Sequence, residues 1–275
     1  MGSDALLVGC GALGSDVGQR LADAGHDVVA LRRSAGLVPP ALRGVSVDLT
    51  RETPSLPESQ PELLVVALTA RPRTEESYRA TYVDGMLRAL DALRGPPRRA
   101  VLVSSTAVHG DAPSVPVTDE CTPPRPVDGP ARMLVEAEQT FLRRLPHGTV
   151  LRLSGLYGHG NGRLQDRVRS GQIGDPDRWT NRIHRDDAAA AVVHLLTVAD
   201  QPDQLYIGTD DRPTKLGEVA AFLAERLGLD PPAAPTDTPG HGKRLSNVRL
   251  RATGWVPTFP TFREGYADVG AATTP

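Results

Sequence analysis

The chain has few of the residues that cross-link small secreted proteins or anchor membrane proteins. Its 275 residues include two cysteines, Cys10 and Cys121, too few for a disulfide framework or a zinc site. No apolar run approaches the roughly 18 residues of a membrane span, and the N-terminus lacks the charged and then apolar order of a signal peptide. We therefore expect a soluble, cytoplasmic protein that uses neither a metal nor a membrane.

Charge is nearly balanced, with a formal net charge of -2 and a pI near 6.4. Because neither sign dominates, electrostatics gives no reason to expect nucleic acid as a partner. The chain is long enough to bury a large core without covalent cross-links. The expected partner is a small-molecule substrate.

What the sequence does contain is a regular alternation of apolar runs and helical stretches. Apolar runs bounded by turn residues occur at 5–8, 28–31, 45–47, 63–68, 100–103 and 150–153. Between them, residues 13–24, 75–93 and 132–145 carry apolar side chains at three- and four-residue spacing. This alternation predicts a Rossmann-type α/β fold with a doubly wound parallel sheet.

The second half of the chain is less regular. We expect a proline-rich loop at 113–130, a glycine-rich loop at 155–162, helices at 164–170, 186–198 and 215–227, a strand at 205–207 and a flexible connector at 231–242. This organisation predicts a dinucleotide-binding domain over residues 1–155, with 183–208 packing back on it. Residues 156–182 and 209–275 would form a smaller substrate-binding lobe.

The first apolar run leads into Gly9-Cys10-Gly11-Ala12-Leu13-Gly14, which opens an amphipathic helix. In that strand-turn-helix setting the glycine pattern is typical of dinucleotide phosphate binding. Gly9 permits a tight turn, Gly11 lets the backbone approach the diphosphate, and Gly14 lets helix and strand pack closely. The start of the helix, with Ala12 and Leu13, would face the negative charge.

The second apolar run ends in Arg32-Arg33-Ser34, where an NAD-selective site would carry an aspartate or glutamate. Guanidinium groups bind phosphate oxygens in a bidentate manner, so this end of the strand favours the 2′-phosphate of NADP over NAD. Two solvated surface arginines are the alternative interpretation.

Several further segments carry a family resemblance. They are Asp48-Leu49, the stretch from Ser104 to Gly110 (SSTAVHG), that from Leu151 to Gly158 (LRLSGLYG), that from Ile183 to Asp187 (IHRDD) and that from Gly242 to Asn247 (GKRLSN). With the glycine turn, they resemble the short-chain dehydrogenase/reductase superfamily, in its extended or atypical branch of NAD-dependent epimerase/dehydratase-like proteins. The resemblance implies that Asp48 and Leu49 contact the adenine, that Ala67, Leu68 and Thr69 line the cofactor path, and that Ser105 is the catalytic serine.

The sequence departs from that family at its usual acid-base pair, a tyrosine followed four residues later by a lysine. None of the five tyrosines has a lysine at this distance. The matching helix puts Asp128 or Pro130 in the tyrosine slot and Arg132 or Leu134 in the lysine slot. One candidate replacement is His109, because the imidazole of a histidine ordinarily titrates near the working pH. Thr106 is a candidate hydrogen-bond donor beside Ser105. A structural role is the alternative for both residues.

Other polar residues are weaker candidates. His159, Asn161 and Arg182 are candidates to face the cleft from the second lobe, whereas we expect His184 to be structural. Glu120 is a candidate acid or base, although loop carboxylates are usually solvated.

These features leave three functions open. The first is an NADP-dependent oxidoreductase acting on a small polar metabolite, such as a nucleotide sugar or secondary metabolite, with Ser105 orienting the reacting oxygen. The second is an isomerase, dehydratase or cyclase on the same fold with no net redox change, and the third is a non-catalytic NADP-binding sensor. Ser105 and a full second lobe favour an enzyme. A homodimer formed through residues 75–93 and 132–145 also stays open.

Overall fold

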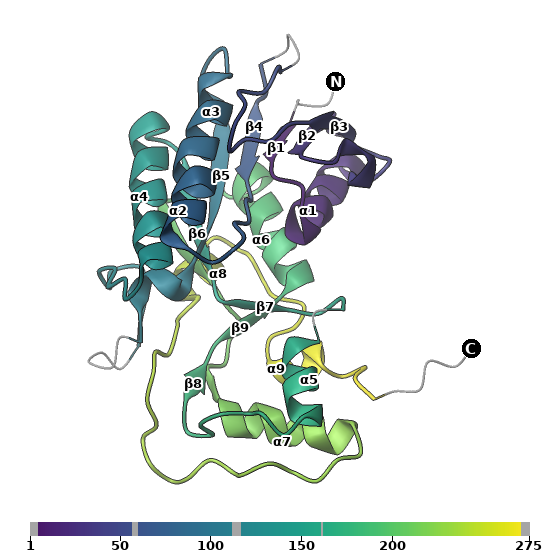
Figure 1. Cartoon of the computed structure of the whole chain (residues 1–275), viewed down its shortest axis with the longest axis vertical. Helices are drawn as coiled ribbons and strands as arrows, with labels where there is room; N and C mark the ends of the chain where they lie inside the picture. Colours follow the sequence, from purple (N-terminus) through teal and green to yellow (C-terminus); the bar gives the residue numbers. More distant parts are fainter. Residues whose placement is uncertain (1–4, 57–59, 112–116, 161, 271–275) are drawn as a thin grey trace.

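The computed structural model describes residues 5–56, 60–111, 117–160 and 162–270. Its upper part is built on one seven-stranded sheet of order β10-β6-β5-β4-β1-β2-β3 (Figure 1). The strands are β1 (Ala5–Val8), β2 (Val28–Arg32), β3 (Arg43–Ser46), β4 (Leu63–Val66), β5 (Arg99–Ser105), β6 (Thr149–Leu153) and β10 (Leu205–Gly208). Every pair in this sheet is parallel, which confirms the predicted fold class.

Helices cover both faces of the sheet (Figure 1). On one face lie α1 (Ala12–Asp23) and α6 (Arg185–Thr197). On the other lie α4 (Gly129–Arg144) and a helical segment made of α2 (Glu75–Tyr78), a π-helical turn (Arg79–Gly85) and α3 (Met86–Asp91). Alternate strand residues therefore enter two separate cores: Leu7 packs with the α1 and α6 side, and Leu6 with Met86 and Phe141 on the other.

A small lobe, defined here by α5, β8, β11, α7 and α9, lies below the sheet (Figure 1). Its elements are α5 (Arg163–Arg169), β8 (Trp179–Thr180), β11 (Thr214–Lys215), α7 (Leu216–Arg226) and α9 (Phe262–Gly265). Strands β7 (Gly155–Tyr157) and β9 (Arg182–His184) form a parallel pair above it, and α8 (Val248–Ala252) lies beside β10. The lobe has its own core, which includes Val219, Leu223 and Phe262.

The structure corrects several predicted boundaries. Gly155–Tyr157 is a strand rather than part of a loop, because it pairs with β9. Pro130 belongs to the first turn of α4, where a missing N–H costs no helical hydrogen bond. Part of the predicted proline-rich loop, residues 112–116, lies outside the described residues, as does Asn161.

Glu120 also differs from the expectation. Its side chain is only 4% exposed, and its carboxylate accepts the Ile207 amide of edge strand β10 at 2.8 Å. Burial raises the pKa of Glu120, partly offset by that hydrogen bond. This loop carboxylate is therefore a structural cap on the sheet edge rather than a solvated group.

Within the described ranges, none of the helices combines the length and the apolar character needed to cross a lipid bilayer.

Candidate active site

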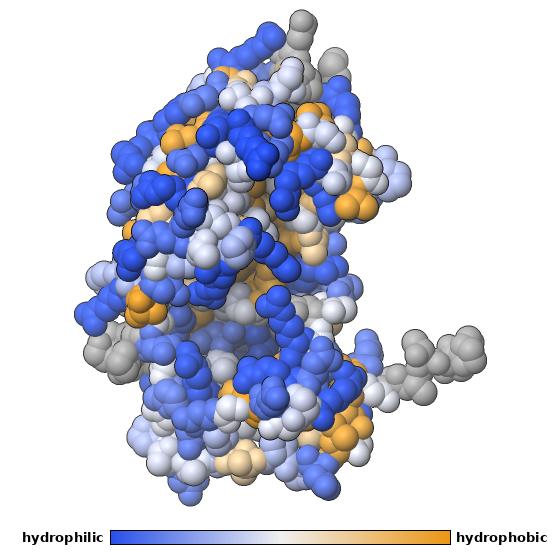
Figure 2. Space-filling model, in the orientation of Figure 1, coloured by the Kyte–Doolittle hydropathy of each residue, from blue (hydrophilic) through white to orange (hydrophobic). Residues whose placement is uncertain are grey.

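A cleft with a volume of about 730 Å³ lies between the carboxyl ends of the central strands and the small lobe. Figure 2 shows the surface hollowed between these two parts of the molecule. The cleft is lined by Gly11 of the glycine turn, Ser105 at the end of β5 and Arg182 of β9. The strand order reverses between β1 and β4, and sheets of this kind bind ligands beside such a reversal.

The glycine turn is packed tightly on one side and open on the other. Gly9 has a φ of +98°, and a Cβ there would lie 2.5 Å from the Ala67 carbonyl oxygen. A Cβ on Gly14 would lie 2.3 Å from the Gly9 carbonyl oxygen, whereas a Cβ on Gly11 would meet nothing within 4 Å. The open space lies at the start of α1, so the turn fits a diphosphate approached by helix N-terminal amides. Ala12 and Leu13 line the same wall.

The two arginines after β2 have different surroundings. Arg32 Nη1 donates to the Cys10 carbonyl at 2.8 Å and to the Leu37 carbonyl at 3.0 Å, so this guanidinium holds the glycine turn. Arg33 and Ser34 are exposed. Of the pair, Arg33 is thus the guanidinium that faces solvent beside the turn.

Asp48 and Leu49 lie after β3. Asp48 Oδ1 accepts hydrogen bonds from the Thr50 amide at 3.0 Å and the Thr50 hydroxyl at 2.7 Å. The Thr50 hydroxyl bond is the main cause that lowers the pKa of Asp48, with smaller help from Arg33. Leu49 is buried in the core on the α3 face, so its side chain is packed inside the protein.

Ala67, Leu68 and Thr69 follow β4 and line the cleft. Strand β4 ends at Val66, two residues before the predicted end, because these residues leave the sheet. Tyr82 also lines the cleft, and its hydroxyl donates to the Leu68 carbonyl at 3.0 Å.

Ser105 lines the cleft, whereas Thr106 and His109 are not among its described lining residues. The Ser105 hydroxyl oxygen accepts the Ala107 amide at 3.2 Å and caps a 3₁₀ turn (Thr106–His109). Its own proton stays available to a ligand oxygen. Thr106 is 6% exposed, and its carbonyl accepts Lys243 Nζ at 2.7 Å.

His109 is fully buried in a polar network beneath the cleft. Its Nε2 accepts a hydrogen bond from Arg152 Nη1 at 3.1 Å, and Arg152 Nη2 forms an ion pair with Glu138 at 2.7 Å. Ser104 donates to the same Glu138 at 2.5 Å. Burial, followed by the charges of Arg152 and Lys243, lowers the pKa of His109 to about 4. A neutral, buried imidazole held by a guanidinium does not suit the expected proton relay, so we do not retain that role for His109.

The slots of the usual acid-base pair carry other functions in α4. Asp128 caps the helix by accepting the Ala131 amide at 2.7 Å, and Arg132 pairs with Glu75 at 2.8 Å in an exposed position. Pro130 is buried in the first turn, and Leu134 lines the cleft. Of the two alignments, the one in which Leu134 takes the lysine slot therefore puts a slot residue at the wall of the cleft.

The cleft is rich in positive charge. Its described lining includes no aspartate or glutamate but five arginines: Arg71, Arg163, Arg167, Arg182 and Arg185. Arg182 is 6% exposed, its Nη2 donates to Thr180 Oγ1 at 2.6 Å, and its Nη1 has no hydrogen-bond partner within the described structure. Burial lowers the pKa of Arg182 and raises the pKa of neighbouring Asp210 to about 7. Neither carboxyl oxygen of Asp210 has a partner in the described ranges.

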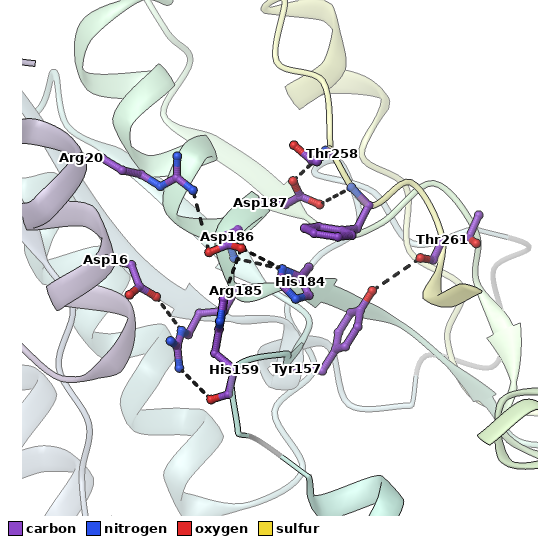
Figure 3. A network of polar contacts seen from close by, with 11 residues as sticks. Asp16, Arg20, Tyr157, His159, His184, Arg185, Asp186, Asp187, Thr258 and Thr261 are labelled. Atoms are coloured by element: carbon purple, nitrogen blue, oxygen red, sulfur yellow. Dashed lines mark hydrogen bonds and ion pairs between the residues drawn. The ribbon is translucent and has the colours of Figure 1, made fainter. Parts of the chain in front are cut away.

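An ion-pair network joins α1 to the loop after β7 (Figure 3). Arg185 pairs with Asp16 at 2.5 Å, and Asp186 pairs with His159 at 2.8 Å. His184 is 7% exposed and caps α6 by accepting the Asp186 amide at 3.3 Å. Asp186 and the two histidines offer possible metal-ligand atoms within 4.8 Å of one another. Arg20 lies 3.8 Å from the same carboxylate, so a guanidinium of the protein already pairs with Asp186 and we assign no metal here.

Three tyrosines that the sequence pattern did not single out, Tyr82, Tyr157 and Tyr266, line the cleft. Arg182 was only a weak candidate from the sequence. No local sequence pattern shows that β9 brings Arg182 to the cleft wall by pairing with β7.

The fold, the glycine turn and the cleft define a dinucleotide-binding α/β enzyme. More specifically, the chain belongs to the NAD dependent epimerase/dehydratase family, whose model matches residues 5–208. No curated protein matches the chain.

Solved structures resemble it over nearly its whole length. A putative NAD-dependent epimerase/dehydratase from Methylobacillus flagellatus is 36% identical with a TM-score of 0.82, and the match covers 98% of each chain. UDP-glucose 4-epimerases from Thermotoga maritima, with UDP-glucose, and Thermus thermophilus, with NAD, are 17% and 22% identical with TM-scores of 0.79 and 0.74, each match covering 97% of both chains. The last two likenesses concern the fold alone.

Proposed function

We propose that the chain is an NADP-dependent oxidoreductase of the atypical short-chain dehydrogenase/reductase type that acts on a small polar metabolite with a negatively charged group. The observation that carries the proposal is one continuous cleft lined by the open face of Gly11, the hydroxyl of Ser105 and the guanidinium of Arg182. The nicotinamide, when bound, supplies the hydride chemistry.

The residues present suit this cofactor. The open face of Gly11 leaves room for a diphosphate at the start of α1, and Gly9 and Gly14 allow the close backbone packing of the turn. Arg33 and Ser34 would hold the 2′-phosphate, and Ala67, Leu68 and Thr69 would flank the cofactor along the cleft. Asp48 would lie toward the adenine. Ser105 would orient the reacting oxygen, because its hydroxyl accepts a backbone amide and keeps its proton for a ligand.

Arg182 favours a substrate that carries a negatively charged group. A buried N–H group without an acceptor is costly, and Arg182 Nη1 is buried without a hydrogen-bond partner among the described residues. An anionic oxygen entering the cleft would accept a hydrogen bond from it. Nucleotide sugars have this chemistry, and the Thermotoga maritima epimerase structure contains one.

The second candidate is an isomerase, dehydratase or cyclase without net redox change. It is favoured by the slots in α4, where Pro130 and Leu134 stand in place of the usual acid-base pair. Candidate substrates are mixed with purified protein and reduced cofactor while the absorbance of the reduced nicotinamide is followed. Product formed with stoichiometric consumption of reduced cofactor supports the oxidoreductase, and product without consumption supports the alternative.

Cofactor choice is tested by calorimetry with NADP and NAD on two matched variants. Arg33→Ala should weaken NADP about 10- to 150-fold, the equivalent of the ~1.5–3 kcal/mol of a hydrogen bond to a charged group, and leave NAD unchanged. Arg32→Ala should weaken both, because Arg32 holds the Cys10 carbonyl of the glycine turn. Equal weakening by Arg33→Ala would contradict the NADP assignment. Absence of heat from either dinucleotide with the unmodified protein would overturn the whole proposal.

A further inference from the structure

The proposed reaction needs a group that gives a proton to the reacting oxygen. The α4 slots hold Pro130 and Leu134, neither of which can do so. Within the described structure the cleft is lined by three phenols, Tyr82, Tyr157 and Tyr266. A catalytic role for any of them rests on the proposed function, because it concerns the same cleft and the same cofactor.

Two of these phenols pack into the core of the small lobe. Tyr157 and Tyr266 are each 4% exposed, their ring centroids lie 4.5 Å apart, and both pack in the core of that lobe. The Tyr157 hydroxyl donates to the Thr261 carbonyl at 3.5 Å, away from the sheet (Figure 3). The rings of Tyr157 and Tyr266 therefore serve the packing of the small lobe below the cleft.

Tyr82 has a different place. Its hydroxyl lies 3.0 Å from the Leu68 carbonyl oxygen. Val66, the last residue of β4, pairs with Leu102 of β5. Leu68 lies just past the carboxyl end of β4, Ser105 ends the neighbouring β5, and both line the cleft. The phenol and the Ser105 hydroxyl therefore stand on the same edge of the sheet, in the same cleft.

The helical segment supports this placement. Tyr82 lies within the π-helical turn Arg79–Gly85, between α2 and α3. Its ring packs beside Tyr78, with centroids 5.1 Å apart, and against the core on the α3 face. The ring is thus held in place, while its hydroxyl is at the cleft wall.

We propose that Tyr82 is the proton donor of this enzyme and that Ser105 holds the same substrate oxygen beside it. In the reducing direction, a bound reduced nicotinamide would supply the hydride for the carbonyl carbon. The carbonyl oxygen takes the Tyr82 proton as the C=O double bond becomes a single bond. The phenol O–H bond breaks, a substrate O–H bond forms, and the phenolate recovers a proton from water. The Leu68 carbonyl, which Tyr82 contacts in this structure, is released when the substrate oxygen arrives.

Tyr82 carries the proton that this step transfers. Burial raises the pKa of Tyr82 to about 12, so the phenol is protonated at neutral pH. Tyr78 raises the pKa further by its charge when ionised. Arg71, three residues beyond Leu68, also lines the cleft.

The test uses full-length protein whose tyrosines carry carbon-13 at the hydroxyl-bearing ring carbon. The five tyrosines give five signals, and Tyr82→Phe identifies that of Tyr82. Tyr78→Phe is the matched control, because Tyr78 is on the same helical segment and is not among the described lining residues. Calorimetry on the same samples establishes that NADP⁺ and NADPH are bound.

The proposal expects the Tyr82 signal to move more with NADP⁺ than with NADPH, because the oxidised ring is positively charged. A phenol remote from the nicotinamide would respond equally to both or not at all. With a substrate found in the absorbance screen, Tyr82→Phe should lower kcat about 100-fold or more, while Tyr78→Phe retains it. Bound cofactor without a differential Tyr82 response, or unchanged turnover of Tyr82→Phe, overturns the inference. Failure to bind either cofactor overturns the proposed function instead.

Discussion

The sharpest test of the cofactor site is to add one methyl group at two positions of the glycine turn. Gly11 precedes α1 with a φ of -80°, which alanine adopts readily, and a Cβ there meets nothing within 4 Å. Gly14 is the contrast, since its Cβ would lie 2.3 Å from the Gly9 carbonyl oxygen and the backbone would have to move. Gly11→Ala should therefore fold normally and bind poorly, whereas Gly14→Ala should do neither well.

The magnitudes depend on the space available. Alanine is a weaker N-cap than glycine, so Gly11→Ala should lose at most about 1 kcal/mol of folding stability, or roughly 2–4 °C in Tm. Its methyl group would occupy the space of the diphosphate, and overpacking costs about 1–3 kcal/mol, which corresponds to about 5- to 150-fold weaker binding. Gly14→Ala should lose both stability and affinity.

Thermal denaturation measures the first quantity, and calorimetry with NADP and NAD the second. The separation of the two effects is the informative result. If Gly11→Ala bound both dinucleotides as tightly as the unmodified protein, the diphosphate would not lie over this turn and the argument from its open face would be refuted.

Three further outcomes are expected from the site. Ser105→Ala should keep cofactor affinity and lower kcat about 100-fold or more if Ser105 positions the reacting oxygen; unchanged kcat in steady-state assays would remove it from the site. Arg152→Met leaves the Glu138 charge buried and unpaired, so chemical denaturation should show a loss of about 3–5 kcal/mol, and a loss below about 1 kcal/mol would contradict the buried ion pair. The pKa of His109 is lowered from 6.5 to about 4, so the unfolded chain binds a proton that the folded chain does not. Stability should accordingly fall as pH drops from about 6.5 to 4, and His109→Gln should fall less in denaturation curves across that range; equal slopes would argue against a buried neutral imidazole.

The parallel sheet could be predicted because its strands are apolar on both faces. Leu6 and Leu7, although adjacent, enter different cores. A strand that is buried on both faces in this way appears in the sequence as a continuous apolar run. The glycine turn could also be predicted, since Gly14 packs against the nearby Gly9 carbonyl and Gly9 has a positive φ. Boundaries were less accurate: Ala67 and Leu68 look like strand residues but line the cleft.

The position of His109 shows why a motif alone misleads. Its place in the stretch from Ser104 to Gly110 suggested a catalytic group. However, its imidazole accepts a hydrogen bond from Arg152 on β6, which is paired with Glu138 on α4. Linear spacing does not reveal that these side chains converge.

The sequence by itself determined the α/β class, the glycine turn and the absence of the usual acid-base pair, because each depends on residues close together in the chain. Only the tertiary structure decided which groups share the cleft. Arg182 reaches it because β9 pairs with β7, and Tyr82 and Ser105 line the same cleft because β4 pairs with β5 and the Tyr82 hydroxyl bonds to Leu68 after β4. Such pairings between distant segments result from packing of the whole chain, and no local pattern records them.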